Sequence, residues 1–464
     1  MGSAHDEAEL AALKAVAAER IVAGQVELDL GLDAAAGSGP LEIVASRAGH
    51  LWAALGRAYD RLGLDRAAGG DEVFRALVLA RIIEPTSKLD SLRVLEETGV
   101  NAPSYRTIKR RLPGYANPLW RKEISAACAA HAVLGPASLV LYDVSTLYFE
   151  TDQGDGFREP GFSKERRLEP QITIGLLTDA TGFPLAVEAF EGNKAETATM
   201  LPTLQAFMTA HRLTDITVVA DAGMLSEANM KAIEAAGLGF ILGNRIAHTP
   251  YVIDDWCKKH PGDDVSDGLT LTQPWPGGAN STRREQVIYY QYRADRARRT
   301  LRGIDEQVGK AEKAVAGKVP VKRNRFITLA GGDKSVNREL EAKARALAGW
   351  KSYITNISAP TPEFVIAAYH QLWQIEKSFR MSKHDLQARP IYHRKRESID
   401  AHLSIVFAAL AVTHYIEAQT DWSIKRFVRT ARRYRTIDIR AGSHILVAED
   451  PLPTDLRDAL AVIT

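Results

Sequence analysis

The 464-residue chain is poor in cysteine and lacks long apolar runs. Its two cysteines, Cys128 and Cys257, exclude a disulfide framework and a cysteine-rich zinc site, and this low usage fits a reducing cytoplasm. No apolar run approaches the roughly 20 residues that span a bilayer. The N-terminal stretch "MGSAHDEAELAALKAVAAER" lacks the apolar segment of a secretory signal. We therefore expect a cytoplasmic protein with no membrane segment.

Several familiar catalytic motifs are also missing. The sequence contains no Gly-x-Ser-x-Gly, no P-loop, no His-Glu-x-x-His and no Cys–His pair, which removes the chemistries that depend on them. It has no evident internal repeat or long low-complexity segment. What remains is the composition of a soluble globular protein, 45% hydrophobic and 25% charged. A chain of this length is expected to form roughly two to four domains or subdomains.

The net charge of +2 favours no particular partner, but positive charge is unevenly distributed along the chain. Residues Arg283 to Arg325 hold 13 Lys/Arg against 5 Asp/Glu, and Lys425 to Arg440 hold 7 against 1. Clusters of this density can follow a phosphate backbone. Each cluster taken alone is also consistent with a solvated helix face.

Residues 1–135 carry apolar side chains at helical spacing. At about 88–115 the pattern predicts a helix-turn-helix: "KLDSLRVLEETG" ends at a glycine, Ser104 caps a second helix, and Pro113 is expected to end it. The second helix would expose basic side chains, among them Arg106, Lys109 and Arg110. This pattern suits a helix in a DNA major groove. Helix pairs with a basic second member are common, so an ordinary helical region stays open as an alternative.

From about residue 136 the sequence pattern changes to runs of β-branched and apolar residues. These runs predict a mixed sheet flanked by helices over residues 136–245. Residues 246–358 combine a Gly/Pro-rich stretch, an aromatic run and a charged helix, and are interpreted as an insertion into that core. Residues 359–420 would complete the core, ending in the apolar helix "SIDAHLSIVFAALAVTHYIEAQ", which is expected to be buried. Residues 421–464 form a basic C-terminal segment.

Three acidic residues lie where a protein core does not favour them. Asp143 lies within the apolar strand "SLVLYDVS", Asp221 ends "ITVVAD", and Glu376 lies on a later helix whose neighbours look packed. A buried carboxylate needs a partner, a proton or a metal. Converging at a sheet edge, the three would supply oxygen ligands for two Mg²⁺ ions in phosphodiester cleavage. Asp221 as a turn residue and Glu376 as a surface acid are the simpler alternatives.

The stretch "YHQLWQIEKSFRMSK" repeats Tyr369, Glu376 and Lys383 seven residues apart. In an uninterrupted helix from about 361 to 383, seven residues turn through about 700°, so the three would line one stripe with Arg380 beside it. Glu376 would hold metal, Lys383 and Arg380 would hold phosphates, and Tyr369 would contact DNA. The alternative is a surface ion pair of Glu376 with Arg380 or Lys383.

At these residues the chain resembles bacterial insertion-sequence transposases of the IS4-type DDE class, most closely the IS1634-like group. The most specific stretches are "LYDVSTLYFE", "EGNKAET", "VVADAGMLSEAN" and "YHQLWQIEKSFRMSKHDLQARPIYHRKRESIDAHL". The resemblance implies a mixed α/β fold with a ribonuclease-H-like core, preceded by a helical DNA-binding region. It also implies a mostly β insertion between the second Asp and the Glu.

Carried over by motif, the resemblance makes Asp143, Asp221 and Glu376 a catalytic triad that binds two Mg²⁺ or Mn²⁺ ions. Tyr369 and Lys383 match the tyrosine and lysine of the Y-(2)-R-(3)-E-(6)-K signature. The arginine position of that signature holds Leu372 here. Any phosphate contact made by that arginine must be lost or moved, and Arg380 is a candidate replacement.

The resemblance further implies nicking at the terminal inverted repeats of a mobile element, hairpin formation at the ends, and strand transfer into target DNA. It implies double-stranded DNA as the partner, a homodimer in the active complex, and a nucleoid-associated protein of the bacterial cytoplasm. One alternative is a catalytically inactive, domesticated DNA-binding regulator. Another is a dehalogenase-type phosphohydrolase, which "LYDVST" faintly resembles, although Ser145 stands where that motif has its second acid.

Overall fold

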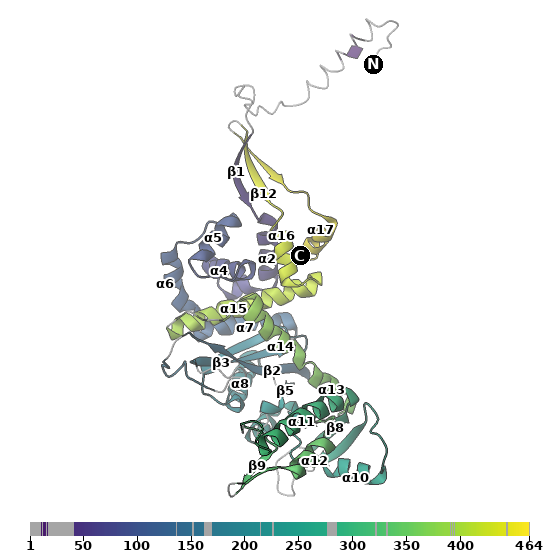
Figure 1. Ribbon diagram of the computed structural model, residues 1–464. Coiled ribbons are helices and arrows are strands. Elements are labelled where there is room, and N and C mark those ends of the chain that lie inside the picture. Colours follow the sequence, from purple (N-terminus) through teal and green to yellow (C-terminus); the bar gives the residue numbers. More distant parts are fainter. Residues whose placement is uncertain are drawn as a thin grey trace.

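The computed structural model is elongated, with a large central sheet between helical layers (Figure 1). It describes residues 41–464 together with residues 11, 13, 14 and 16, apart from these gaps: 136, 151–152, 162–168, 214, 225–226, 276–284, 321–322, 331–332, 390, 392, 394, 442–443 and 464. The helical pattern expected for residues 1–40 therefore lies almost entirely outside the described residues. The basic stretch that begins at Arg283 lies partly outside them.

The central sheet has eight strands in the order β4-β3-β2-β5-β6-β11-β8-β7. Their bounds, in that order, are Pro184–Glu191, Gln171–Asp179, Ser138–Tyr148, Ile216–Ala220, Gly239–Asn244, Trp350–Thr355, Gln286–Tyr292 and Thr270–Trp275. Strands β2, β5 and β6 are parallel, and every other neighbouring pair is antiparallel. The mixed α/β fold is thus confirmed, and three antiparallel strands followed by two parallel ones are consistent with a ribonuclease-H-like core.

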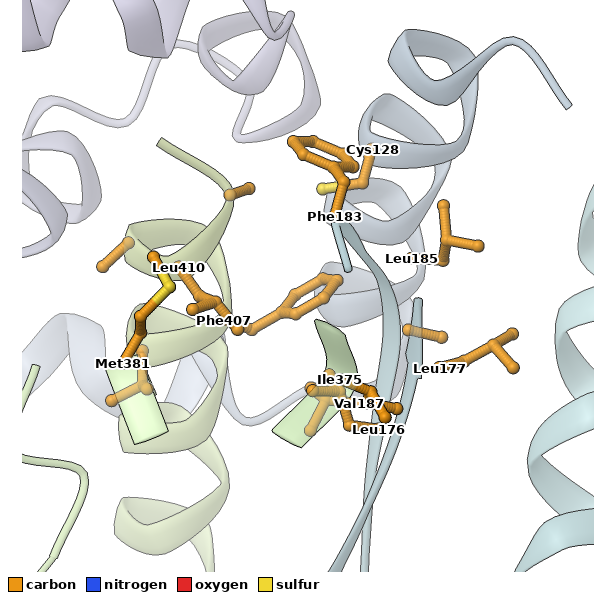
Figure 2. Packing of buried hydrophobic residues seen from close by; sticks show 14 of the residues in the cluster. Cys128, Leu176, Leu177, Phe183, Leu185, Val187, Ile375, Met381, Phe407 and Leu410 are labelled. Carbon is orange, nitrogen blue, oxygen red and sulfur yellow. The ribbon is translucent and has the colours of Figure 1, made fainter. Parts of the chain in front are cut away.

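The middle of this sheet is covered on both faces, as its apolar sequences predict. Strand β3, "QITIGLLTD", is buried along nearly its whole length. Helices α14 (Leu372–Arg380) and α15 (Arg396–Thr420) lie on one face, and α8 (Met200–His211) contacts β3 and β4. In Figure 2, Phe407 points from α15 toward the strands, and Leu176 and Val187 lie beside Ile375 of α14.

Helix α15 is the central support of the molecule. It is buried from Ile399 to Ile416 except at Asp400, and it packs against strand β4 and against several helices of the N-terminal region. Those helices are α2 (Gly49–Arg61), α4 (Glu72–Ile83), α6 (Tyr105–Tyr115) and α7 (Pro118–Ala132); α3 (Leu64–Ala67) and α5 (Asp90–Glu97) pack on other helices of the same region. Of the described helices, α15 alone is long and apolar enough to cross a membrane, but 94% of its apolar window is buried within the protein. The burial expected from its sequence is confirmed.

The N-terminal and C-terminal regions form one body, which sequence reasoning did not foresee. Strand β1 (Glu42–Arg47) pairs with β12 (Thr436–Ala441), and β12 pairs with β13 (His444–Glu449). The expectation that residues 1–135 are helical is therefore wrong at β1. Helices α16 (Ile424–Ala431) and α17 (Thr454–Ala461) complete this end of the molecule (Figure 1).

The expected pair of helices between 88 and 115 is present as α5 and α6. Ser104 caps α6 as predicted, with its side-chain oxygen accepting a hydrogen bond from the Thr107 amide at 3.1 Å. Pro113 does not end this helix, which continues to Tyr115; the proline removes the one hydrogen bond that its own amide would donate, and only two helical residues follow it. Helix α5 packs on α4, while α6 packs mainly on α15. The helix-turn-helix function stays a prediction.

The segment 246–358 differs from the expected mostly β insertion. Its strands β7, β8 and β11 extend the central sheet, and its longest element is the 22-residue helix α11. Its other elements are α10 (Tyr251–Lys259), β9 (Ile327–Ala330), β10 (Asp333–Val336) and α12 (Arg338–Ala346), with α11 at Ala294–Val315. The face of α11 toward the β9–β10 hairpin builds a small second core around Ile304, Val308 and Phe326. An amphipathic helix stabilised by this packing replaces the expected β structure.

Candidate active site at the ends of strands β2 and β5

Asp143 and Asp221 lie at neighbouring positions of the central sheet. Strands β2 and β5 are parallel, and their last paired residues are Tyr142 and Ala220. Asp143 follows Tyr142 and Asp221 follows Ala220, so the two acids continue the same register. Asp143 is half-buried within β2, whereas Asp221 is exposed beyond the end of β5. Adjacent parallel strands thus bring together two carboxylates that are 78 residues apart in sequence, and we call this place the acidic edge.

The helix expected from 361 to 383 is interrupted twice. Helix α13 (Pro362–His370) ends at a turn at Gln371, α14 follows, and a π-helix, η3 (Met381–Asp385), takes over at the far end. The prediction of one uninterrupted helix is therefore wrong, and the seven-residue spacing does not by itself align the three side chains. Such breaks occur where side-chain packing disturbs the regular backbone hydrogen bonds of a helix. Short π-helical turns of this kind are frequent at functional sites.

Despite the first break, Tyr369 reaches the acidic edge. The residue is only 4% exposed, and its hydroxyl donates a hydrogen bond to Oδ1 of Asp221. Burial and the neighbouring carboxylate raise the pKa of Tyr369 far above its ordinary value, so it remains a neutral donor. A buried donor to a carboxylate fixes the orientation of that carboxylate, whereas DNA stacking would need an exposed ring.

Two glycines allow these helices to approach the sheet so closely. On β6, a Cβ at Gly243 would lie 2.7 Å from the Tyr369 hydroxyl and 3.0 Å from the Ala222 amide nitrogen. In the β3–β4 turn, Gly182 has φ +88° and a Cβ there would lie 2.9 Å from the Gln374 carbonyl oxygen. The Ser378 hydroxyl, on α14, donates to the Gly182 carbonyl oxygen at 2.7 Å. Glycine therefore determines how α13 and α14 dock on the acidic edge.

Lys383 and Arg380 are directed to different places. Lys383, on η3, donates a hydrogen bond to the Ser145 hydroxyl, and Ser145 lies two residues from Asp143 on the same face of β2. Arg380 is exposed and lines a cleft of about 850 Å³ together with Trp373 and Lys377. In the described structure Arg380 forms no ion pair with Glu376. Lys383 thus joins the acidic edge, while Arg380 belongs to the neighbouring cleft.

Lys351 is a functional candidate that sequence reasoning missed. It lies on β11, half-buried, with its ammonium nitrogen 4.2 Å from the centre of the Tyr369 ring. Burial lowers the pKa of Lys351, and the negative charges of Asp221 and Glu376 oppose that shift. The ammonium therefore lies within the field of two of the three predicted catalytic acids. The pairing of β11, the last strand of the insertion, with β6 of the core brings this lysine here.

The three acids offer the ligand chemistry of a hard divalent cation but are not gathered into a complete site. Asp143, Asp221 and Glu376 provide carboxylate oxygens, which Mg²⁺ and Mn²⁺ prefer. Among the described residues, however, no three Asp, Glu, His or Cys side chains form a group that could hold a metal ion. Glu376 is exposed on α14, and one oxygen of Asp221 is engaged by Tyr369. The donor set fits the cation, although in this structure the three carboxylates do not converge on one point.

The basic residues predicted to bind DNA have mixed surroundings. Arg106, Lys109 and Arg110 are exposed on α6, as the helical pattern predicts. In the C-terminal basic segment, by contrast, Arg432 forms ion pairs with Glu84 and Glu97 at 2.7 and 2.5 Å. Part of this segment therefore attaches the C-terminal region to the helical region, so its positive charge is not all available to a phosphate backbone.

Residues 134–412, more than half of the chain, match the family described as the transposase DDE domain. The chain belongs to this family of DDE transposases, whose members act in DNA transposition and generally use divalent metal ions. No relative was found among functionally curated proteins.

Among solved structures, the chain is similar to a piggyBac transposase in a synaptic complex with hairpin DNA, determined by cryo-electron microscopy. The two share 11% sequence identity with a TM-score of 0.40, and the match covers 77% of this chain and 69% of the other.

Proposed function

We propose that this protein is an insertion-sequence transposase of the IS4 type, IS1634-like group, that cuts and joins DNA strands at the terminal inverted repeats of its element. The observation that carries the proposal is the acidic edge, where Asp143 and Asp221 follow a shared register and Tyr369 holds Asp221. Glu376, on the helix beside it, is the third acid. The reaction is phosphodiester cleavage followed by transfer of the released 3′-hydroxyl.

Asp143, Asp221 and Glu376 would hold two Mg²⁺ or Mn²⁺ ions, which when bound supply Lewis-acid activation of the attacking and leaving oxygens. The remaining roles belong to side chains around them. Tyr369 keeps the Asp221 carboxylate in one orientation, and Lys383 anchors η3 to β2 through Ser145.

Lys351 is the cation best placed to stabilise negative charge on a phosphate at the acidic edge. The arginine of the family signature is replaced by Leu372, which is packed against the hydrophobic core. Lys351 shares the field of Asp221 and Glu376, whereas Arg380 faces the cleft. We therefore assign the missing positive charge to Lys351 and keep Arg380, Arg106, Lys109 and Arg110 as contacts to DNA outside the reacting phosphate.

The finer features of the proposed reaction are a hairpin intermediate at each element end, target capture, and a homodimer that holds two ends. The protein would act at the nucleoid in the bacterial cytoplasm. These features follow the resemblance to IS4-type transposases.

A nicking assay tests the proposal. Duplexes carrying the inverted repeats that flank the reading frame are incubated with Mg²⁺ and either wild-type protein, Glu376→Gln or Glu363→Gln. Glu363 is a matched control because it is an exposed glutamate on α13. We expect nicks at the repeat ends from wild type and Glu363→Gln only. Equal nicking by wild type and Glu376→Gln would sink the catalytic proposal.

The alternative of a DNA-binding regulator has its own outcome in the same assay. Wild-type protein would then bind the repeats and leave both strands intact. One observation favours this alternative: in the described structure, the three acids do not form a complete metal-binding group.

A further inference from the structure

Five basic side chains gather where the helical region meets the loop that follows η3. They come from α4, the loop before α5, α6, the loop before α15, and α15 itself: Arg81, Lys88, Lys109, His393 and His402. We call this set the basic cluster. It lies outside the acidic edge and includes only one residue, Lys109, that the sequence pattern singled out.

Within the basic cluster, Lys88, His393 and His402 lie in close contact. The ammonium nitrogen of Lys88 lies 3.5 Å from Nδ1 of His393. The rings of His393 and His402 have their centres 5.4 Å apart, and Nε2 of His402 lies 3.2 Å from the Ala388 carbonyl oxygen. His402 is buried, whereas Arg81, Lys88 and His393 are half-buried. A small external group could therefore reach the last three.

The positive charges of this cluster disfavour one another, and burial disfavours each of them further. Burial lowers the pKa of Lys88, and the charge of Lys109 lowers it further. The pKa of His393 falls to about 4 because of burial and of the charges of Lys88 and Arg81. Burial alone lowers the pKa of Arg81 to about 10. Within the part of the chain that the structure describes, no Asp or Glu forms an ion pair with Arg81, Lys88 or His393.

The nearby Arg432 is a cation with a structural role, and it is paired with carboxylates. Arg432 is similarly half-buried and has the carboxylates of Glu84 and Glu97 within 2.7 Å. A half-buried cation without such a partner is costly, and several together more so. Clusters of perturbed basic groups of this kind are characteristic of sites for an external anion.

We propose that the basic cluster binds a phosphodiester of the DNA backbone, held among Arg81, Lys88 and His393; this inference rests on the proposed transposase function. A guanidinium, an ammonium and an imidazole that can take up a proton are suited to phosphate oxygens. Lys109 extends the positive surface along α6. In the same loop as His393, the Arg389 guanidinium lies over the Tyr148 ring at 5.6 Å, at the end of β2. The phosphate site is thereby connected to the strand that carries Asp143.

The first test measures duplex binding across a range of salt concentrations in a Glu376→Gln background, which removes cleavage. Lys88→Gln is compared with Lys122→Gln, because Lys122 also acts on a histidine of lowered pKa, His211, elsewhere on the surface. Loss of one phosphate contact should weaken binding several-fold and reduce the log–log salt slope by about 0.9. Lys122→Gln should leave both unchanged. Equal salt slopes for the two variants would overturn the proposal.

The second test follows the protonation of His393 by NMR on histidine-labelled protein. A bound phosphodiester favours the imidazolium, so a mixed-sequence DNA duplex should raise the pKa of His393 by at least about one unit, while that of His211 stays unchanged. Inorganic phosphate at millimolar concentration is the comparison. If phosphate shifts His393 and the duplex does not, the site serves a free anion and the proposal fails. If neither shifts it, the proposal fails as well.

These measurements are independent of strand cleavage. A protein that binds duplex through the basic cluster but never nicks would refute the proposed function and leave this inference standing. A protein that nicks at the repeat ends, but whose His393 pKa does not change on addition of duplex, would support the proposed function and refute this inference.

Discussion

The acidic edge and the basic cluster differ in whether the protein itself supplies partners for their charged groups. At the edge, Asp221 accepts a hydrogen bond from Tyr369 and lies near the Lys351 ammonium. In the cluster, Lys88 faces His393, and the neighbouring charges are of the same sign. The edge is therefore held in shape by the protein itself, whereas the cluster gains opposite charge only when an anion arrives. Both are consistent with a protein whose substrate is a polyanion.

The largest expected effect is at the edge. Asp221→Asn removes the negative charge that the proposed metal site needs while preserving the shape of the side chain, so cleavage should fall on the order of 10³-fold. Duplex binding should be unchanged, because the basic surfaces are intact. Strand cleavage and electrophoretic mobility measure the two. The exposed Asp254 on α10 gives a matched control in Asp254→Asn, and a comparable loss there would show that the effect is not specific to the edge.

The next prediction tests whether packing at Gly243 keeps Tyr369 in contact with Asp221. Gly243→Ala places a methyl group 2.7 Å from the Tyr369 hydroxyl, so Tyr369 must move away from Asp221. We expect a loss of about 1–3 kcal/mol in the free energy of unfolding, as in other overpacked cores, with reduced cleavage.

The control for that change is Gly303→Ala on α11, where an added Cβ meets nothing within 4 Å. An alanine in a helix interior should stabilise the fold by about 0.5–1 kcal/mol. Thermal unfolding and cleavage assays compare the variants. Full cleavage activity in Gly243→Ala would contradict the positioning role given to Tyr369.

A smaller effect is expected at Lys351. In Lys351→Met the aliphatic packing is largely kept and the ammonium is lost, so cleavage at saturating Mg²⁺ should fall about 10-fold. The Mg²⁺ concentration needed for half-maximal cleavage should decrease, because a competing cation has left the field of Asp221 and Glu376. Lys258→Met on α10 is the control, since Lys258 is exposed and pairs with Asp254. A raised Mg²⁺ requirement would show that Lys351 does not compete with the metal.

The last effect is on stability alone and concerns a neutral histidine beneath α14. Burial and the charge of Lys377 lower the pKa of His414 to about 3, and its Nε2 lies 3.0 Å from the Ser378 hydroxyl. The unfolded chain takes up this proton first, so the stabilisation is complete above pH 6.5 and is lost as the pH falls toward 3. The loss is about 1.4 kcal/mol for each pH unit below 6.5.

His414→Gln should flatten this part of the stability curve, measured by denaturant unfolding between pH 7 and 5. His393 differs from His414 because DNA should restore its proton, as proposed above, whereas His414 is largely buried and has Lys377 beside it. An unaltered pH dependence in His414→Gln would mean that other groups dominate acid unfolding.

Much of the fold could be predicted from local patterns. The apolar runs around Asp143 and Asp221 form β2 and β5, and the all-round apolar helix that follows Glu376 is the buried α15. The Ser104 cap was also identified correctly, because capping depends on a few neighbouring residues. Errors occurred where contacts distant in sequence decide the structure. Strand β1 exists because β12, about 390 residues away, pairs with it.

The sequence by itself determined the residue types of this protein: three acids, a tyrosine and a lysine in a recognisable order, with hydrophobic patterns strong enough to specify the sheet. The tertiary structure decided which of them meet. It interrupted the helix at Gln371, placed Tyr369 on Asp221 beside Gly243, and brought Lys351 to the site from the last strand of the insertion. The physical reason is that periodicity fixes which face a residue occupies, while packing between distant segments fixes which faces come into contact.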